Sequence, residues 1–157
     1  MTLDARGVVT TCPSCGTANR LVYASLDKAV RCAQCKNALP RPDRPLEAPD
    51  TAIFDAAAHG SRLPLVVDFW AAWCGPCRMV APELERVARA NAGRLLVVKV
   101  DTEALKELAA RYRIRSIPTL AVVHEGRELD RVAGARSAPD IEAFVTQTLA
   151  ANQRRAS

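Results

Sequence analysis

The sequence predicts an α/β protein in which helices flank a mixed central sheet, preceded by a small zinc-ribbon-like module. Two Cys-x-x-Cys pairs lie within the first 40 residues, four prolines interrupt residues 36–50, and strand patterns alternate with helix patterns from residue 51 onward. Such alternation is typical of a sheet covered by helices. We therefore expect a four-cysteine zinc-binding module at 1–40, a proline-rich linker at 41–50 and an α/β domain at 51–157. A short edge strand near Leu46 is the alternative to a wholly irregular linker.

The first four cysteines form a candidate metal site. Cys12-x2-Cys15 and Cys32-x2-Cys35 are separated by 16 residues, which is a spacing typical of four-thiolate zinc sites. A closed site of this kind leaves no coordination position for a substrate, so the sequence predicts one structural zinc. The segment between the pairs is mostly polar, and the metal is therefore expected to supply much of the module's stability. Two disulfides or four free thiols are the alternatives.

The elements expected after residue 50 follow from apolar periodicity and turn residues. Strands are expected at 65–70, 95–100, 119–124 and 128–133, and helices at 51–59, 74–90, about 105–112 and from Ser137 onward. Strand 65–70 is apolar on both faces, as a central strand covered by helices should be. Thr51 is expected to cap the first helix, Gly60 to close it, and Pro82 to kink the second.

The third cysteine pair, Cys74 and Cys77, opens a helix directly behind strand 65–70. Two sulfurs at this spacing can close into a disulfide and open again, and the positive end of a helix favours a thiolate on Cys74. This arrangement predicts dithiol–disulfide exchange, with Cys74 as the nucleophile and the more buried Cys77 as the resolving thiol. A zinc half-site is the alternative.

Asp68 is the one charged residue in the apolar strand that precedes this pair. Burial would raise the pKa of its carboxyl and suit it to exchanging a proton with Cys77. An aspartate that faces solvent at the end of the strand is the alternative. Trp70 is expected to pack beneath the pair, and Trp73 to lie exposed beside Cys74 as part of a docking surface.

Composition argues against several other classes of protein. The net charge of +5 is not gathered into a basic run, so nucleic-acid binding has little support. No apolar stretch is long enough to span a membrane. The N-terminal residues lack the apolar segment of a signal peptide, which predicts a cytoplasmic, reducing location. His59 and His124 have no ligand spacing to any cysteine pair.

Residues from about 51 to 150 resemble the thioredoxin family along their whole length. The matching stretches are 67–77, 99–101 and 115–119, together with Gly126 and Gly134. The four-cysteine module narrows the resemblance to the zinc-bearing bacterial thioredoxin 2 type. The chain departs from the family at Arg113, where glycine is common.

The resemblance implies a protein-disulfide reductase, a thiol–disulfide oxidoreductase of electron transport. Its electrons would come from NADPH through thioredoxin reductase, its substrates would be disulfide-containing client proteins, and it would act as a monomer without a bound organic cofactor. The resemblance also implies a cis peptide bond between Ile117 and Pro118, which would press that loop against the sulfurs and offer its backbone to an extended substrate strand. Lys99 would neighbour Asp68 and tune it. The implied substrate-binding residues are Trp73, Gly75, Pro76, Ile117, Pro118 and Gly134.

A second functional class stays open. The chain would then be a zinc-dependent redox sensor or a holdase-type binding protein whose α/β domain mainly docks partners. The complete set of Cys74, Cys77, Asp68 and Pro118 favours the enzyme, because a docking module needs no thiols.

Overall fold

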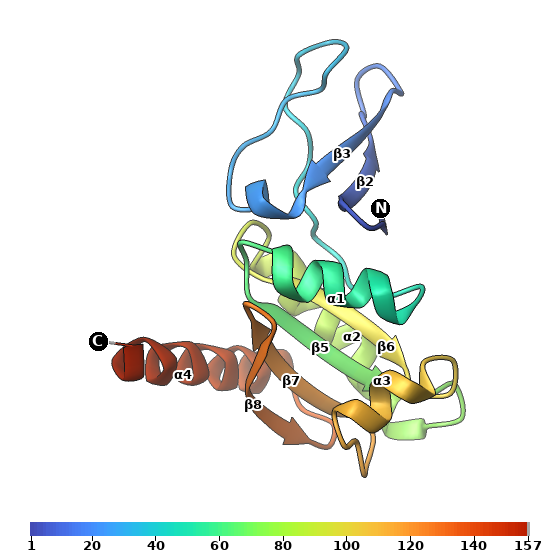
Figure 1. The fold of residues 1–157 in the computed structure, drawn as a ribbon, viewed down its shortest axis with the longest axis vertical. Coiled ribbons are helices and arrows are strands. Elements are labelled where there is room, and N and C mark those ends of the chain that lie inside the picture. Colours follow the sequence, from blue (N-terminus) through green and yellow to red (C-terminus); the bar gives the residue numbers. More distant parts are fainter. Residues whose placement is uncertain (157) are drawn as a thin grey trace.

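The computed structural model describes residues 1–156 and contains two separate sheets (Figure 1). The N-terminal sheet is antiparallel, and its strands are β1 (Thr2–Leu3), β2 (Gly7–Thr11) and β3 (Ala18–Val22), followed by the 3-10 turn η1 (Tyr23–Ser25). The second sheet has the order β4-β6-β5-β7-β8. Its strands are β4 (Leu46–Glu47), β5 (Leu65–Trp70), β6 (Leu96–Asp101), β7 (Thr119–His124) and β8 (Arg127–Ala133). β4 and β5 both pair with β6 in parallel, whereas β7 pairs antiparallel with both β5 and β8. This confirms the predicted mixed sheet.

Four helices cover the second sheet. They are α1 (Thr51–Gly60), α2 (Gly75–Ala90), α3 (Lys106–Arg111) and α4 (Ala138–Ala156). Residues that alternate along β5 divide between two cores: Val67 and Phe69 pack with the residues of α1 and α3, whereas Val66 packs with those of α2 and α4. β5 is therefore buried on both faces, as its sequence predicts. Pro82 lies inside α2 without ending it.

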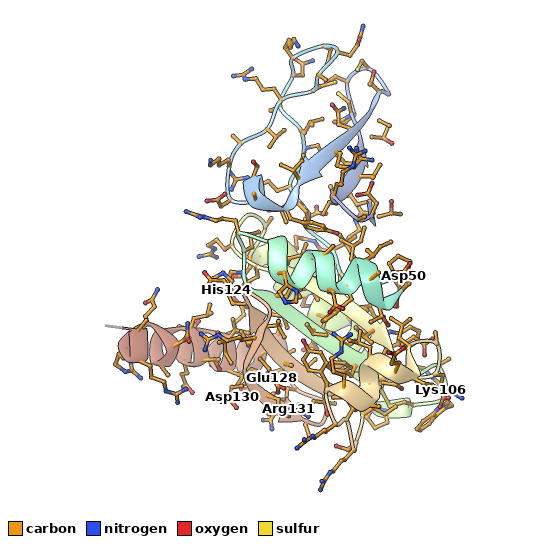
Figure 2. All side chains as sticks on the ribbon, in the orientation of Figure 1. Asp50, Lys106, His124, Glu128, Asp130 and Arg131 are labelled. Atoms are coloured by element: carbon orange, nitrogen blue, oxygen red, sulfur yellow. A yellow bond between two sulfur atoms is a disulfide. The ribbon has the colours of Figure 1, made fainter. Side chains whose placement is uncertain are left out.

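The start of α1 differs from the prediction by one residue. Asp50, not Thr51, is the N-cap, and its carboxylate accepts a 2.8 Å hydrogen bond from the Ile53 N–H. Asp50 is extended, with φ −156° and ψ 172°, which leaves its side chain free to reach into the first turn (Figure 2). At the other end Gly60 is still helical and Ser61 is the C-cap.

The N-terminal sheet rests on the side of α1 that faces away from the large sheet (Figure 1). Tyr23 is buried there beside Gly60, its hydroxyl donates to the Asp4 carbonyl at 2.7 Å, and its own carbonyl accepts from the Arg62 N–H at 3.0 Å. Leu26 joins the same core. Contacts with α1 therefore stabilise the module beyond what its own few apolar residues would provide.

The proline-rich segment at 41–50 is partly ordered as a strand. Its two-residue strand β4 adds to the edge of the large sheet, where Leu46 pairs with Val98 and Glu47 pairs with Lys99. The alternative of a short edge strand near Leu46 is therefore the one observed. The division of the chain at residues 40 and 50 stays a prediction.

The C-terminal part agrees closely with the predicted hairpin and helix. The turn between β7 and β8 contains Glu125 and Gly126, both with positive φ, and β8 begins one residue earlier than predicted. Ser137 precedes α4, and its hydroxyl accepts from the Asp140 N–H at 3.3 Å. Within residues 1–156, no helix is long and apolar enough to cross a membrane.

Candidate functional site

Cys74 and Cys77 form a disulfide at the point where the chain passes from β5 into α2. Cys74 is the N-cap of α2, and its sulfur accepts a 3.2 Å hydrogen bond from the Cys77 N–H. The sequence predicted that Cys77 would be the more buried of the two. This is wrong for the disulfide form, in which Cys74 is 3% and Cys77 4% exposed. Ala71 is buried in the same cluster as the two cysteines, and Trp70 and Ile117 pack against this cluster.

The loop before β7 lies against this disulfide. The Ile117–Pro118 peptide bond is cis, as the family resemblance implied, and the Ile117 carbonyl oxygen lies 3.7 Å from the Cys74 sulfur. Two hydrogen bonds hold the loop: the Gly134 N–H donates to the Pro118 carbonyl at 2.8 Å, and the Thr119 hydroxyl donates to the Ser116 carbonyl at 2.6 Å. The loop is therefore fixed between α2 and the end of β8.

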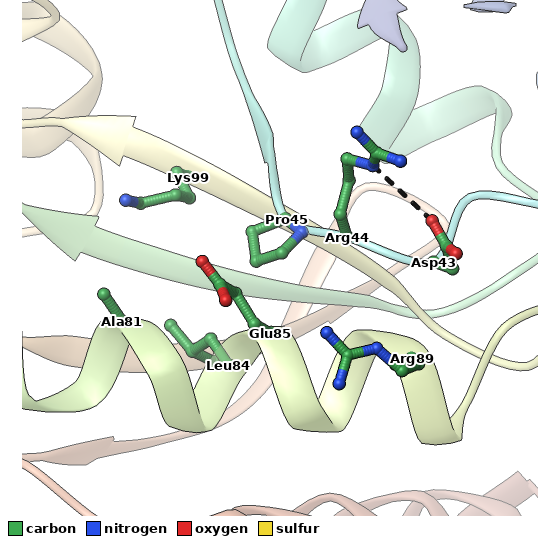
Figure 3. Close-up of a pocket in the computed structure, with 8 residues that line it drawn as sticks. All are labelled: Asp43, Arg44, Pro45, Ala81, Leu84, Glu85, Arg89 and Lys99. Carbon is green, nitrogen blue, oxygen red and sulfur yellow. Dashed lines mark ion pairs between the residues drawn. The ribbon is translucent and has the colours of Figure 1, made fainter.

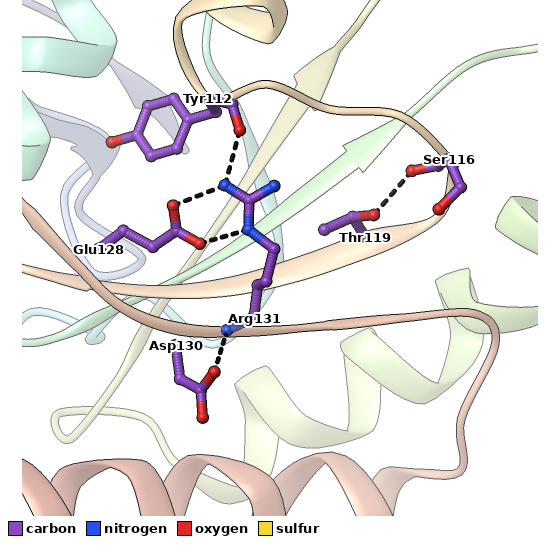
Figure 4. A network of polar contacts seen from close by, with 6 residues as sticks. All are labelled: Tyr112, Ser116, Thr119, Glu128, Asp130 and Arg131. Atoms are coloured by element: carbon purple, nitrogen blue, oxygen red, sulfur yellow. Dashed lines mark hydrogen bonds and ion pairs between the residues drawn. The ribbon is translucent and has the colours of Figure 1, made fainter.

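A second anchor for the same loop was not predicted. Arg131 on β8 donates to both carboxylate oxygens of Glu128, at 2.5 and 2.6 Å, and to the Tyr112 carbonyl at 2.6 Å (Figure 4). Tyr112 ends α3, and its ring packs between Phe54 and Phe69 with centroid distances of 5.9 and 5.3 Å. The guanidinium thereby ties the end of α3 to β8. In the sequence, this contact was signalled only by the opposite charges of Glu128 and Arg131 within one predicted strand.

Asp68 lies on the central strand and is 1% exposed. Burial raises the pKa of its carboxyl to about 6, while the charge of Lys99 acts in the opposite direction. Lys99 is its direct partner on β6, which agrees with the implied neighbourhood. Asp68 Oδ1 and Trp70 Nε1 are the two buried side-chain polar atoms of residues 1–156 without a hydrogen-bond partner.

An exposed apolar surface borders the disulfide. Trp73 is 66% exposed, and its indole N–H donates to Glu103 at 3.0 Å. Beside it lies an open groove of about 600 Å³, which Ile114, Ser116 and Ile117 also line. Nothing lies within 4 Å of where a Cβ on Gly75 would sit, so this side of the helix start is open too. Pro76 occupies the first turn of α2. Such a surface can accept an extended peptide next to the sulfurs.

The other four cysteines come together in the N-terminal module. The sulfurs of Cys12, Cys15, Cys32 and Cys35 all lie within 4.8 Å of one another, and two of the pairs are separated by 3.6 Å. Tetrahedral zinc with Zn–S bonds of about 2.3 Å needs sulfurs about 3.8 Å apart, so the spacing fits that metal. The backbone N–H of Cys35 and the Asn19 amide lower the pKa of the Cys32 thiol to about 6.

Comparison with known proteins identifies the family. The thioredoxin family model matches residues 45–147, which is more than half of the chain. The chain belongs to the thioredoxin family. It is 36% identical to thioredoxin C-3 of Corynebacterium nephridii over 146 residues, a match that covers 93% of this chain and 99% of that protein. It is also 51% identical to thioredoxin 1 of a Nostoc species, over 48% of this chain and 70% of that protein.

Solved thioredoxins share the fold. A mutant thioredoxin from Halobacterium salinarum superposes with a TM-score of 0.63 at 27% identity, covering 70% of this chain and 95% of that one. A Malassezia sympodialis thioredoxin superposes with a TM-score of 0.61 at 32% identity, covering 70% of this chain and 94% of that one. As a member of this family, the chain is a thiol–disulfide oxidoreductase, and Cys74 and Cys77 lie at disulfide distance.

Proposed function

We propose that this thioredoxin is a protein-disulfide reductase that works through Cys74 and Cys77 and carries one structural zinc. The observation that carries the proposal is the Cys74–Cys77 disulfide at the start of α2, held against the cis Ile117–Pro118 loop with Asp68 buried in the adjoining strand. A pair that closes into a disulfide in one state can donate two electrons in the other.

In the dithiol state, the N–H groups at the start of α2 stabilise a thiolate on Cys74. This thiolate attacks one sulfur of the client disulfide, so a Cys74–client bond forms, the client S–S bond breaks, and one client thiolate leaves and takes up a proton. Cys77 then gives its proton to the Asp68 carboxylate and attacks the Cys74 sulfur. The second client thiolate leaves, the Cys74–Cys77 disulfide forms, and two electrons have passed to the client.

Client binding is proposed at the surface beside the sulfurs. The backbone of Ile117 would pair with an extended client segment, and the exposed ring of Trp73 would pack on that segment. Gly75, Pro76, Pro118 and Gly134 shape the remainder of this surface. Thioredoxin reductase, with NADPH as the electron source, would restore the dithiol, and we expect the chain to act as a cytoplasmic monomer.

Cys12, Cys15, Cys32 and Cys35 would hold the zinc. When bound, the metal would link the two cysteine turns and stabilise the module. Each turn is closed by a hydrogen bond, Gly16 N–H to Cys12 O at 2.9 Å and Lys36 N–H to Cys32 O at 3.0 Å, and the close approach of the four sulfurs supports this assignment.

Reduction of insulin disulfides by the full chain, with thioredoxin reductase and NADPH, tests the proposal. We expect turnover by the native protein and none by Cys74→Ser. The matched variant Cys77→Ser should still attack but accumulate a Cys74–client mixed disulfide, which mass spectrometry detects. Full turnover by Cys74→Ser would refute the assigned nucleophile.

A further inference from the structure

The groove beside the disulfide carries positive charge. Lys106, at the start of α3, and Arg115, in the loop before β7, both line this groove of about 600 Å³, and among residues 1–156 no aspartate or glutamate lines it. Both residues are exposed, and Figure 2 shows Lys106 at the outer edge of the domain. Neither takes part in an ion pair of 4.0 Å or shorter within residues 1–156. Their charges are therefore available to a ligand in the groove.

Two further arginines belong to segments that adjoin the disulfide. Arg78, in the first turn of α2, donates to the Ala72 carbonyl at 3.2 Å. Arg136 follows Gly134, whose N–H holds the cis-proline loop, and donates to the Ala133 carbonyl at 3.3 Å. Both arginines are exposed, and a carbonyl partner leaves the charge of a guanidinium unneutralised. The four cations lie far apart in the chain, so the sequence shows no basic run although the fold brings them around one site.

The nearby carboxylates do not balance these four cations. Asp101 ends β6 and accepts from the Glu103 N–H at 2.9 Å, while Glu103 accepts from the Trp73 indole N–H at 3.0 Å. Glu107 does not line the groove, and its charge raises the pKa of Arg111, one turn further along α3. The surface beside the sulfurs therefore has a net positive charge.

The cavity beside β4 shows a different distribution of charge. It has a volume of about 400 Å³ and lies between the segment before β4 and α2 (Figure 3). Its lining combines cations and carboxylates, and the Arg44 and Asp43 side chains form an ion pair there at 3.5 Å. The charged residues of this lining are Asp43, Arg44, Glu85, Arg89 and Lys99. Complementarity to an anionic ligand is thus a property of the groove and not of every hollow in this basic protein.

We propose that the groove selects client proteins in which acidic residues flank the target disulfide. The inference rests on the proposed reductase activity and names the class of client that this activity favours. An extended client segment beside Ile117 would present its cysteine to the Cys74 sulfur. Because an extended chain advances about 3.3 Å per residue, acidic side chains within about four residues of that cysteine would reach Lys106 or Arg115. Opposite charges would speed the encounter and hold the client while the mixed disulfide forms.

Three synthetic peptides test the inference, each closed by one disulfide and carrying Glu, Gln or Lys on both sides of one cysteine. The reduced full-length protein is mixed with each peptide, and rapid quenching with mass spectrometry follows its oxidation in a single turnover, so thioredoxin reductase does not enter the rate. At low ionic strength the Glu peptide should react about 3- to 10-fold faster than the Gln peptide, and the Lys peptide more slowly, since exposed ion pairs contribute modestly. At about 1 M salt, where screening acts over about 3 Å, the three rates should converge. Each rate is divided by the rate with dithiothreitol, which corrects for the intrinsic reactivity of the peptide disulfide.

Lys106→Glu combined with Arg115→Glu should reverse the order of the Glu and Lys peptides. The matched control, Lys28→Glu combined with Arg94→Glu, changes the net charge equally at exposed residues of the N-terminal module and beyond the far end of α2, and it should keep the native order. Equal rates for the three peptides with the native protein, an unchanged order in the first variant, or a reversal in the control would each overturn the inference while the reductase activity stands. No reaction with any peptide would refute the proposed function and this inference with it.

Discussion

Lys99 places its ammonium 4.4 Å from the centre of the Trp70 ring, although Asp68 is its direct partner on the neighbouring strand. A close ion pair would favour the charged form of Asp68 and hold its pKa low. With the ammonium drawn over the indole, burial outweighs the attraction, and the pKa of Asp68 rises to about 6. The position of Lys99 thus leaves the buried carboxyl able to gain and lose a proton near neutral pH.

Replacing Lys99 by Met should raise the pKa of Asp68 further. The ammonium is the influence that lowers this pKa, so its removal leaves burial unopposed. We expect an upward shift of about half to one pH unit. The ¹³C titration of Asp68 measures it, with the exposed Lys28→Met as a control for the loss of one positive charge. A downward or absent shift would show that Lys99 does not act on Asp68.

Asp68→Asn should change how stability depends on pH. The carboxyl has a pKa of about 6 in the folded protein and 3.8 in the unfolded chain, so the folded state binds the extra proton. Its contribution to stability is complete below about pH 4 and is lost as the pH rises through 6. The advantage of Asn over Asp in the free energy of unfolding should therefore grow by about 3 kcal/mol between about pH 3 and pH 8. Urea unfolding across this range measures it, and a difference independent of pH would contradict it.

Much of the redox site could be predicted because its residues lie on strongly patterned elements. The apolar run of β5 and the helix signal of α2 place Cys74 at a helix start, and the lone carboxylate of Asp68 stands out in such a strand. The cis bond before Pro118 came from family resemblance alone, because most bonds before proline are trans. The similar burial of Cys74 and Cys77 could not be predicted, because Ile117, which packs against the cluster around them, is distant in sequence.

Other features could not be predicted from the apolar periodicity of the sequence. A two-residue strand such as β4 has no period, so the place of Glu47 in the sheet could not be predicted. Glu128 and Arg131 are three apart and would lie on opposite faces of a regular strand. An irregularity in register opposite Val122 and Val123 changes the phase of β8 between them and brings both to one side.

Arg131→Met should weaken the anchor of the loop before β7. It leaves the Glu128 carboxylate and the Tyr112 carbonyl without the donors they share. Because the Arg131 side chain is 35% exposed, solvent compensates in part, and we expect a loss of about 1 kcal/mol in the free energy of unfolding. Arg127→Met, at the exposed start of β8, should change it by less than about 0.5 kcal/mol. Equal losses in the two variants would show that the network adds no stability.

Arg113→Gly should stabilise the protein. Arg113 has a φ of 53°, a left-handed conformation that glycine adopts without steric cost. This explains why the departure from the family at this position is tolerated but unfavourable. We expect a gain of up to about 1 kcal/mol in the free energy of unfolding, reduced by the greater entropy of glycine in the unfolded chain. Arg113→Ala keeps the strained backbone and should show no gain, which separates backbone strain from loss of the charge.

Removal of zinc should loosen one end of the N-terminal module and spare the other. The amides of Gly16 and Lys36 lie in the two cysteine turns, whereas the Arg62 amide bonds to Tyr23 in the core shared with α1. We expect the metal to link the two cysteine turns and packing on α1 to hold the end of the module around Tyr23. A chelator that releases about one zinc per chain should then lower the hydrogen-exchange protection of the turn amides at least about 100-fold. Arg62 and the amides of β5 should keep theirs.

Cys35→Ser should reproduce the effect of the chelator without added reagent, because it removes one of the four ligands. Cys77→Ser, which removes a sulfur from the redox pair, is the matched control and should leave the zinc content and the turn amides unchanged. Protein purified under reducing conditions without any zinc would refute the metal site. An equal loss of protection at Arg62 would instead show that the whole module unfolds when the metal leaves. Packing on α1 would then be too weak to hold the end of the module around Tyr23.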